Sequence, residues 1–324
     1  MSPSLDIIIV NWNTGRQLYD CLESITTTHR EGIDLQRVVV IDNASVDGSA
    51  DHLDNLDLPL VVIRNTTNRG FATACNQGAS TSRADYLLFL NPDTRLCSNS
   101  LAAPVYYMEQ SEQSGVGICG IQLVDEHGNV NRTCARFPHP RNFLTKITGL
   151  SLLFPNTFHS SFMLDWNHMN SRYVNQVMGA FFLTRRSLFE SMKGFDERFF
   201  VYYEELDFSI RAYKDGWLTY YLTNAQVYHK GHGSSEQVRA TALFYSLLSR
   251  IQYCYKHFNW LSATMVAVAT LLLEPITRIG FALLRSNRRD VIKQTIQCYL
   301  KLWRSIPSML RNETRCFVER EQSK

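Results

Sequence analysis

The chain has 324 residues, of which 45% are hydrophobic and 19% charged. These values are typical of a globular protein with a sizeable core, in one large domain or one domain with an appendage. The formal net charge is only +3, and no Arg/Lys-rich segment occurs before residue 240, so we expect no nucleic-acid partner. The eight cysteines form no CxxC pair and no zinc-ligand spacing, which predicts free thiols in a reducing compartment.

The first apolar stretch, residues 5–10, follows no basic segment and is too short for the hydrophobic part of a signal peptide. It is better interpreted as a buried first strand. We therefore expect a cytoplasmic protein.

Short apolar runs alternate with helical spacing through the first half of the chain. The predicted strands are residues 6–10, 37–41, 60–64, 85–90 and 115–123, and the predicted helices are residues 16–28, 48–56, 71–82 and 98–110. This alternation predicts an α/β fold with a Rossmann-like, mostly parallel sheet flanked by helices. Further along the chain we expect a turn at 125–128, an apolar segment at 177–184 and a helix at 202–215.

Composition divides the chain into a large α/β domain, residues 1–240, and a helical extension, residues 241–324. The extension contains an apolar stretch at 261–284, interrupted by Glu274, Pro275 and Arg278 and followed by basic residues. Such a helix suits a membrane interface, although packing on the α/β domain or on a partner subunit is an equal alternative.

Polar residues follow four of the predicted strands, at 11–13, 42–45, 65–70 and 91–93. In open α/β sheets, ligands bind beyond the carboxyl ends of the strands. A single polar end is explained by a helix cap or a turn, but four in succession predict a binding site.

Particular residues at these ends suit a nucleotide diphosphate. Asp42 can accept a hydrogen bond from a ribose hydroxyl or a pyrimidine N–H, and Arg69 can pair with phosphate beside the flexible Gly70. Asp93 follows a buried strand, where a carboxylate can hold a hard divalent cation. Asn-Pro-Asp-Thr is also good turn chemistry, which is the structural alternative for that segment.

Glu204, Glu205 and Asp207 begin a predicted helix. Asp207 and Arg211 are four residues apart, the spacing of a structural ion pair. Helical spacing places Glu204 near that pair and Glu205 away from it, so Glu205 is the expected general base and Glu204 its rival. His229 and His232 lie in a glycine-containing segment where an imidazole can complete a metal shell, although a loop histidine is more often only solvated.

These segments in order resemble family 2 glycosyltransferases of the GT-A fold. The resemblance is carried by Asp6–Asn13, Val40–Ser49, Asn68–Gly78, Leu88–Thr94, Gly179–Arg186, Gly194–Phe200 and Glu204–Arg211, and it is greatest to the bacterial rhamnosyltransferase branch. Two positions depart from the family pattern. Asn91 replaces the first acid of the DxD metal motif, and Glu205 replaces an aspartate.

The resemblance implies that residues 1–240 are a catalytic domain, with residues 1–115 its nucleotide-sugar-binding half and residues 116–240 its acceptor-binding and catalytic half. It also implies a role for each matching position. Asp42 matches the nucleoside contact, Asp93 the last acid of DxD, Glu205 the catalytic base, and His229 a ligand of metal or diphosphate. The expected site therefore comprises the catalytic residues Glu205 and Glu204; the metal ligands Asp93 and His229; the donor-binding residues Val10, Asn11, Trp12, Asn13, Asp42, Asn43, Ser45, Asn68, Arg69, Gly70, Asn76, Asn91 and Pro92; and the acceptor-binding residues Gly179, Ala180, Asp196, Tyr203 and Asp207.

The resemblance implies an inverting, Mg²⁺- or Mn²⁺-dependent transferase. Its expected donor is dTDP-L-rhamnose, and its acceptor is a hydroxyl of a glycan or lipid-linked glycan of the cell surface, reached from the inner face of the cytoplasmic membrane. The alternatives are transfer from a UDP-hexose or UDP-N-acetylhexosamine, and a degenerate nucleotide-sugar-binding relative. An NAD-dependent oxidoreductase is a poor fit, because no GxGxxG follows the first strand.

Overall fold

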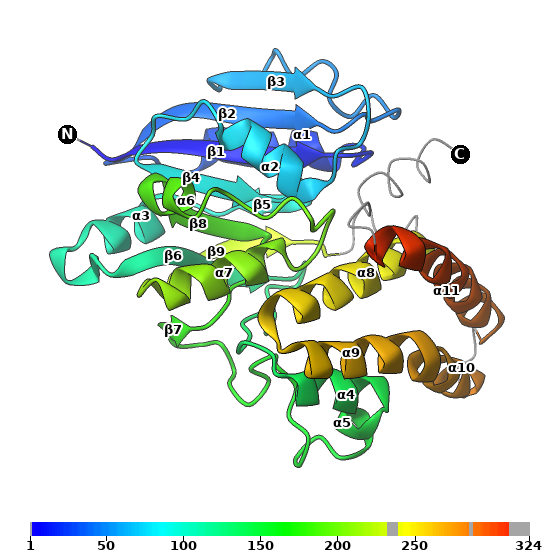
Figure 1. Cartoon of the computed structure of the whole chain (residues 1–324). Coiled ribbons are helices and arrows are strands. Elements are labelled where there is room, and N and C mark those ends of the chain that lie inside the picture. Colours follow the sequence, from blue (N-terminus) through cyan, green and yellow to red (C-terminus); the bar gives the residue numbers. More distant parts are fainter. Residues whose placement is uncertain (1, 232–238, 285–287, 311–324) are drawn as a thin grey trace. The chain divides into compact units, whose positions relative to one another are not determined.

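A computed structural model describes residues 2–231, 239–284 and 288–310. These residues form two compact units (Figure 1). The first comprises residues 2–137, 162–197 and 204–231, and the second comprises residues 138–161, 198–203 and the helices after residue 238. The second unit therefore contains the C-terminal helices together with two short segments from within the first 240 residues.

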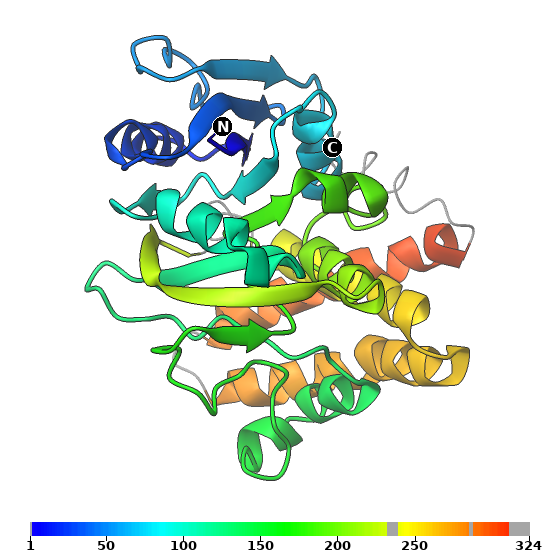
Figure 2. The same ribbon diagram turned by 90° about the vertical axis from the view of Figure 1, so that its left-hand side faces the viewer.

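One sheet runs through the first unit, as Figures 1 and 2 show. Its strand order in the described residues is β3-β2-β1-β4-β8-β6-β9-β5, with β7 beside β9. The strands are β1 (Ser4–Asn11), β2 (Asp34–Asp42), β3 (Leu60–Arg64), β4 (Tyr86–Leu90), β5 (Thr94–Leu96), β6 (Val116–Val124), β7 (Arg172–Val174), β8 (Phe181–Arg185) and β9 (Leu218–His229).

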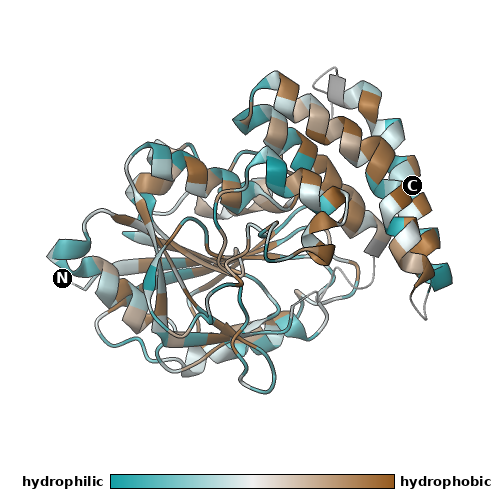
Figure 3. Ribbon diagram, turned by 90° about the horizontal axis from the view of Figure 1, so that it is seen from below, coloured by the Kyte–Doolittle hydropathy of each residue, from teal (hydrophilic) through white to brown (hydrophobic). Residues whose placement is uncertain are grey.

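The two faces of the sheet are covered by different helices. Alternating strand residues give each face its own core, as with Ile7 and Ile9 on one side of β1 and Ile8 and Val10 on the other. Helices α1 (Gln17–Thr27) and α3 (Ala102–Glu109) contribute to the first core. Helices α2 (Phe71–Ala79), α6 (Arg186–Ser191) and α7 (Glu204–Lys214) contribute to the second. Hydrophobic residues accordingly concentrate along the strands in Figure 3.

The predicted α/β fold is confirmed, but the sheet is mixed. Strands β1 to β4 are parallel where they pair, whereas β8 is antiparallel to both β4 and β6, and β5 is antiparallel to β9. The sequence analysis did not identify β5, β7 or β9. The turn at 125–128 is confirmed by a hydrogen bond from Gly128 N to Asp125 O.

The helix expected over residues 48–56 is absent from the structure, which has turns there. Gly48 and His52 have φ of 71° and 56°, in the left-handed region that ends helices. The Asp47 carboxylate also accepts a hydrogen bond from the Ser49 backbone N–H. Local side-chain bonds of this kind compete with helix formation, and a polar segment rich in Asp and Ser makes them readily.

The second unit is helical. It contains α4 (Pro140–Ile147), α5 (Leu150–Leu153), α8 (Arg239–His257), α9 (Trp260–Val268), a π-helical turn (Ala269–Leu273), α10 (Glu274–Leu283) and α11 (Arg288–Leu310). Helices α9 and α10 are joined through the π turn into one helix, and Glu274 and Pro275 begin α10. By length and composition alone, Trp260–Leu283 is long and apolar enough to cross a membrane.

The seven cysteines in the described part of the chain are free thiols, as predicted. Cys316 lies outside the described residues. Burial raises the pKa of Cys21 to about 12, because the low-dielectric core disfavours the thiolate. Such buried thiols are structural and unreactive.

Close packing of α2 on the sheet gives a first prediction. A Cβ on Gly78 would lie 2.6 Å from Ile8 Cγ2, whereas one on Gly115 would meet no atom within 4 Å. We expect Gly78→Ala to lower the free energy of unfolding by about 1–3 kcal/mol through overpacking. Gly115→Ala, the matched control in the same unit, should change it by less than about 0.5 kcal/mol. Chemical denaturation of the two variants measures this, and equal effects would contradict the described packing.

Candidate active site

The candidate site begins where the parallel strands end. Asn11 pairs in register with Asp42, Asp42 with Arg64, and Ile9 with Leu90. The segments that follow β1, β2, β3 and β4 therefore leave the sheet at one edge. The sequence analysis expected polar residues to gather at this edge, and the register accounts for it.

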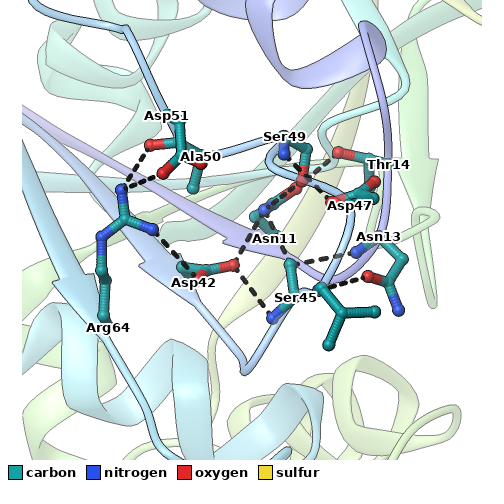
Figure 4. Close-up of polar contacts among 11 residues, drawn as sticks. Asn11, Asn13, Thr14, Asp42, Ser45, Asp47, Ser49, Ala50, Asp51 and Arg64 are labelled. Carbon is teal, nitrogen blue, oxygen red and sulfur yellow. Dashed lines mark hydrogen bonds and ion pairs between the residues drawn. The ribbon is translucent and has the colours of Figure 1, made fainter.

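The Asn11 side chain joins the first two of these segments (Figure 4). Its Nδ2 donates to Asp42 Oδ1 and lies 3.0 Å from Ser45 Oγ and 2.9 Å from Ser49 Oγ. Its Oδ1 accepts a hydrogen bond from the Thr14 hydroxyl. Asn11 is fully buried, and these hydrogen bonds satisfy amide groups that would be costly to bury without partners.

Asn13 reinforces the same junction. Its backbone N–H donates to Ser45 Oγ, and its Oδ1 accepts from the Val46 N–H at 2.8 Å. Asn13 and Ala44 both have positive φ, 51° and 65°, and such strained backbone is commonest at functional sites. Val10 is buried and Trp12 partly exposed beside them. The predicted donor residues 10–13, Asp42 and Ser45 thus form one cluster.

Arg64, which the sequence analysis missed, lies on the other side of Asp42. Its guanidinium is 3.6 Å from Asp42 Oδ2 and donates to Ala50 O and Asp51 Oδ1, each at 2.8 Å (Figure 4). Asp42 is buried while Arg64 is half exposed. Arg64 could have been selected by aligning the ends of the two predicted strands. It is the last residue of β3, the strand next to β2, and it therefore lies beside Asp42.

The loop before α2 is fixed by two asparagines. Asn43 Nδ2 donates to Asn68 Oδ1 at 2.8 Å, and Asn43 Oδ1 accepts from the Arg69 N–H. Gly70 has φ of 85°, which the absence of a Cβ permits. Asn43 therefore holds the loop while the Arg69 side chain stays exposed.

A pocket of about 530 Å³ adjoins the cluster. Its walls come from the start of α1 and from the segment after β2, and they include Gly15, Arg16, Asp47 and Ser49. The Asp47 carboxylate accepts from the Gly15 N–H at 2.8 Å, so this bond joins the two walls. The pocket is within the size range of small-ligand sites.

Asp93 follows β4 on a tight turn. Asn91 O accepts from the Thr94 N–H and from the Thr94 hydroxyl, and Asn91 N–H donates to Ala180 O. The turn expected of Asn-Pro-Asp-Thr is thus present, with Pro92 inside it. It places Asp93 Oδ1 3.4 Å from His229 Nε2, and both side chains are 11% exposed.

Asp93 and His229 provide a carboxylate and an imidazole side by side at the site. Among the described residues no group of three or more His, Cys, Asp or Glu residues could hold a metal ion. An oxygen and a nitrogen donor nonetheless fit Mg²⁺ or Mn²⁺ if diphosphate oxygens and water supply the remaining ligands. His232 lies outside the described residues.

Glu204 and Glu205 begin α7 as adjacent carboxylic acids. Glu204 is 5% exposed and Glu205 partly exposed. Glu205 Oε1 accepts a 3.4 Å hydrogen bond from Gln176 Nε2, and a Cβ on Gly179 would lie 3.6 Å from Glu205 Cγ. The Oε2 atoms of both glutamates have no hydrogen-bond partner among the described residues. Gln176 is a second residue that the sequence gave no reason to select.

The two glutamates differ in how readily they ionise. Burial, and then the nearby Glu205 charge, raises the pKa of Glu204 well above its usual 4.5. Burial also raises the pKa of Glu205, opposed by hydrogen bonds from backbone N–H groups and from Gln176. The pKa of Glu204 is raised further than that of Glu205, so Glu205 is the carboxyl that ionises more readily.

The expected helix over residues 202–215 starts two residues late, at Glu204. Tyr202 and Tyr203 have φ of 68° and 73°, incompatible with an α-helix. The Tyr203 ring packs against Phe143 and Tyr253 within the second unit. Its acceptor-binding role stays a prediction.

Asp207 is fully buried and forms a 2.8 Å ion pair with Arg211, which also donates to Met192 O and Gly194 O. This geometry favours the structural alternative for Asp207 over contact with an acceptor.

Asn76 fixes the segment around Asp196. Its Nδ2 donates to Phe195 O and Glu197 Oε1, and its Oδ1 accepts from the Phe195 N–H. A Cβ on Gly194 would lie 2.5 Å from Asn76 Oδ1. Asn76 thus ties α2 to the segment that carries Asp196, and Asp196 itself is partly exposed.

Comparison with known proteins now identifies the chain. Residues 6–192 match the family model described as glycosyl transferase family 2. The chain belongs to this family. It is therefore a glycosyltransferase with a GT-A fold.

Curated relatives cover most of the chain. An N-acetylglucosaminyl-diphospho-decaprenol L-rhamnosyltransferase of Mycobacterium tuberculosis is 25% identical over 311 residues, which are 90% of this chain and 98% of the relative. Rhamnosyltransferase WbbL of Escherichia coli is 25% identical over 173 residues, 52% of this chain and 61% of the relative.

Solved structures share the fold. Residues 1–349 of Staphylococcus aureus TarS in complex with UDP-GlcNAc superpose with a TM-score of 0.53 at 15% identity, covering 97% of this chain and 89% of that TarS fragment. A Pyrobaculum calidifontis mannosyltransferase in complex with GDP-Man and Mn²⁺ has a TM-score of 0.52 at 17% identity, covering 94% of this chain and 88% of the mannosyltransferase.

The buried Glu204 gives a prediction on stability. Since its pKa is raised on folding, the native state binds more protons than the unfolded state above pH 4.5, and stability falls as pH rises from 4.5 toward the raised pKa. We expect Glu204→Gln to melt at a higher temperature than wild type at pH 8, with a smaller difference at pH 4. Glu190→Gln, at an exposed carboxylate, is the control. A difference that does not depend on pH would contradict the burial of an ionisable group here.

Proposed function

We propose that the enzyme transfers L-rhamnose from dTDP-L-rhamnose, with inversion, onto a hydroxyl of a lipid-linked or polysaccharide acceptor in cell-surface glycan synthesis. The main support is the mycobacterial relative, which is named as an L-rhamnosyltransferase and whose alignment covers 90% of this chain and 98% of the relative. The same name describes a lipid-linked acceptor, so we propose a lipid-linked acceptor here and, with it, a place at the inner face of the cytoplasmic membrane. The product would be an O-antigen, capsule or cell-wall glycan.

Transfer from a UDP-hexose or UDP-N-acetylhexosamine is the second candidate. It is favoured by a 25% identical Haloferax volcanii relative named as a hexosyltransferase, which covers 66% of this chain and 63% of the relative. The same site residues would serve, and both the nucleotide and the sugar of the donor would differ.

The donor nucleotide is proposed to lie across the ends of β1 and β2. Asp42, held by Asn11 and flanked by Arg64, would accept hydrogen bonds from the nucleoside. The exposed Arg69 would pair with phosphate. Burial of Asp42 supports this, since a buried carboxylate with fixed partners is preorganised and loses little entropy on binding.

Asp93 and His229 are the proposed ligands of Mg²⁺ or Mn²⁺. When bound, the cation offsets the charge that develops on the leaving diphosphate. The chain itself contributes the turn at Asn91 and Pro92, which fixes Asp93 before any donor arrives. Structural neighbours with Mn²⁺ support the assignment.

Glu205 is the proposed general base. Its carboxylate would take the proton from the acceptor hydroxyl as that oxygen bonds to the anomeric carbon and the bond from this carbon to the diphosphate oxygen breaks. Attack from the face opposite the leaving group inverts the anomeric configuration. Partial exposure and the smaller rise in its pKa make Glu205 better suited to accept a proton than Glu204.

Loss of the base should lower turnover strongly. We expect Glu205→Gln to reduce kcat by roughly 10²–10⁴-fold, the usual contribution of general base catalysis, with the KM of the donor little changed. Glu190→Gln controls for removal of a carboxylate elsewhere in the same unit. Near-normal turnover of Glu205→Gln would refute the assignment, and a large loss in Glu204→Gln alone would transfer the role to Glu204.

Donor binding should depend on Asp93. Thermal-shift screening of the purified protein against dTDP-rhamnose and UDP-sugars should show stabilisation by one donor that requires Mn²⁺ or Mg²⁺. The metal-dependent shift should be lost in Asp93→Ala. A folded protein that responds to no donor would favour the degenerate-relative alternative, and a metal-independent shift retained in Asp93→Ala would overturn the metal site.

A further inference from the structure

The C-terminal helices expose an unusual amount of apolar surface. Along the joined helix α9–α10, six apolar residues spaced three, four or seven apart are 49–67% exposed on one side. These residues, named here the apolar stripe, are Leu261, Met265, Val268, Leu272, Ile276 and Leu283. A soluble monomer rarely leaves such a continuous row uncovered.

The opposite side of the same helix is buried within the second unit. Ala263, Val266 and Ala267 are packed inside, and Thr270 is fully buried. Glu274 is 3% exposed and pairs with Arg250 and Arg278. Crossing a bilayer would remove Glu274 from these partners and bury a charge in lipid, which is costly. The helix is therefore placed to lie against a surface and not to pass through a membrane.

Helix α11 adds a second row beside the first. Trp303 Nε1 donates to Leu271 O at 3.2 Å, which brings the exposed side of α11 to the π turn of the stripe. On that side Ile296, Leu300 and Trp303 are 43–47% exposed. Arg289, Lys293 and Arg304 are exposed at neighbouring helical positions. An apolar row with Trp and flanking Lys and Arg is typical of interfacial helices.

Charge selects the partner of this surface. Residues 239–310 contain ten Lys or Arg residues and only two Asp or Glu residues, which makes them strongly basic. Residues 1–238 contain nineteen Lys or Arg residues and twenty-five Asp or Glu residues. Two copies of this basic surface would repel each other. An anionic lipid surface would attract it, because each Lys or Arg near such a surface contributes about 1 kcal/mol.

We propose that the apolar stripe and the exposed side of α11 dock the enzyme on the surface of an anionic bilayer. The stripe side chains enter the headgroup region, and Arg289, Lys293 and Arg304 contact lipid phosphates. This inference deepens the proposed function, since it supplies the surface through which a lipid-linked acceptor is reached. Residues 144–154 of the same unit carry further exposed apolar side chains, Leu152, Leu153 and Phe154.

The test is flotation of the full-length protein with vesicles of phosphatidylglycerol and phosphatidylethanolamine, compared with phosphatidylcholine vesicles. Wild type should float with the anionic vesicles. The double variant Leu272→Glu/Ile276→Glu should weaken partitioning into the vesicles by about 100-fold. Each aliphatic side chain that no longer enters the bilayer accounts for roughly tenfold. Arg289→Gln/Lys293→Gln should weaken it by about 30-fold on anionic vesicles only.

The matched control is Tyr106→Glu/Val61→Glu, which adds the same charge at exposed apolar residues of the first unit. It should float like wild type, and circular dichroism checks that each variant is folded. Failure of wild type to float, or wild-type partitioning of Leu272→Glu/Ile276→Glu, would overturn the proposal. A second contradicting outcome comes from light scattering. The proposal would be overturned if the wild-type protein were a dimer that does not bind vesicles and that the same substitutions dissociate. Because flotation uses no sugar substrate, these outcomes leave the transferase assignment unaffected.

Discussion

The buried amide of Asn11 is the interaction on which the donor side of the site depends. It lies at the end of the central strand β1 and within 3.0 Å of oxygens on Asp42, Ser45 and Ser49. Without it, Asp42 would keep Arg64 and the 3.4 Å hydrogen bond from the Ser45 N–H but lose the closer bond to its Oδ1, and the two segments would lose their shared anchor. Because a buried amide left unpaired costs about 1–3 kcal/mol, this geometry is fixed before a ligand binds. The Asp42 carboxylate is thus presented by a rigid sheet edge.

A second constraint acts on the catalytic side. Two carboxylic acids at the start of one helix cannot both ionise when buried, so the fold separates them by environment. Gln176, together with partial exposure, favours charge on Glu205, whereas deeper burial disfavours charge on Glu204. The two residues are of the same type, so their positions in the fold account for the difference in how readily they ionise.

Much of this could be predicted from the sequence because strand ends in a parallel sheet meet at one edge. Asp42 and Asp93 follow continuous apolar strands, and local pattern was sufficient to find them. Arg64 and Gln176 could not be selected in that way, since their partners are brought to them by strand pairing and by a long-range contact. The helix predicted over residues 48–56 is an error of the other kind, an element predicted but absent. Apolar residues there have helical spacing, but hydrogen bonds from Asp and Ser side chains and residues with left-handed backbone prevent a helix. The antiparallel direction of β8 also depends on tertiary pairing that no local pattern reports.

The second unit could be anticipated only in outline. Its apolar and basic composition indicated a surface helix, but which side of the helix stays exposed depends on the buried Arg250–Glu274 pair. The same pair explains why a helix apolar enough to span a membrane is retained in a folded unit. Under these proposals, the first unit carries out the reaction and the second places the enzyme at the membrane.

The anomeric configuration of the product tests the central claim most directly. NMR of the glycan formed from dTDP-L-rhamnose should show a new linkage of opposite configuration to the donor, as expected when Glu205 activates the acceptor for a single displacement. A linkage with retained configuration would contradict that mechanism and the role of Glu205 in it.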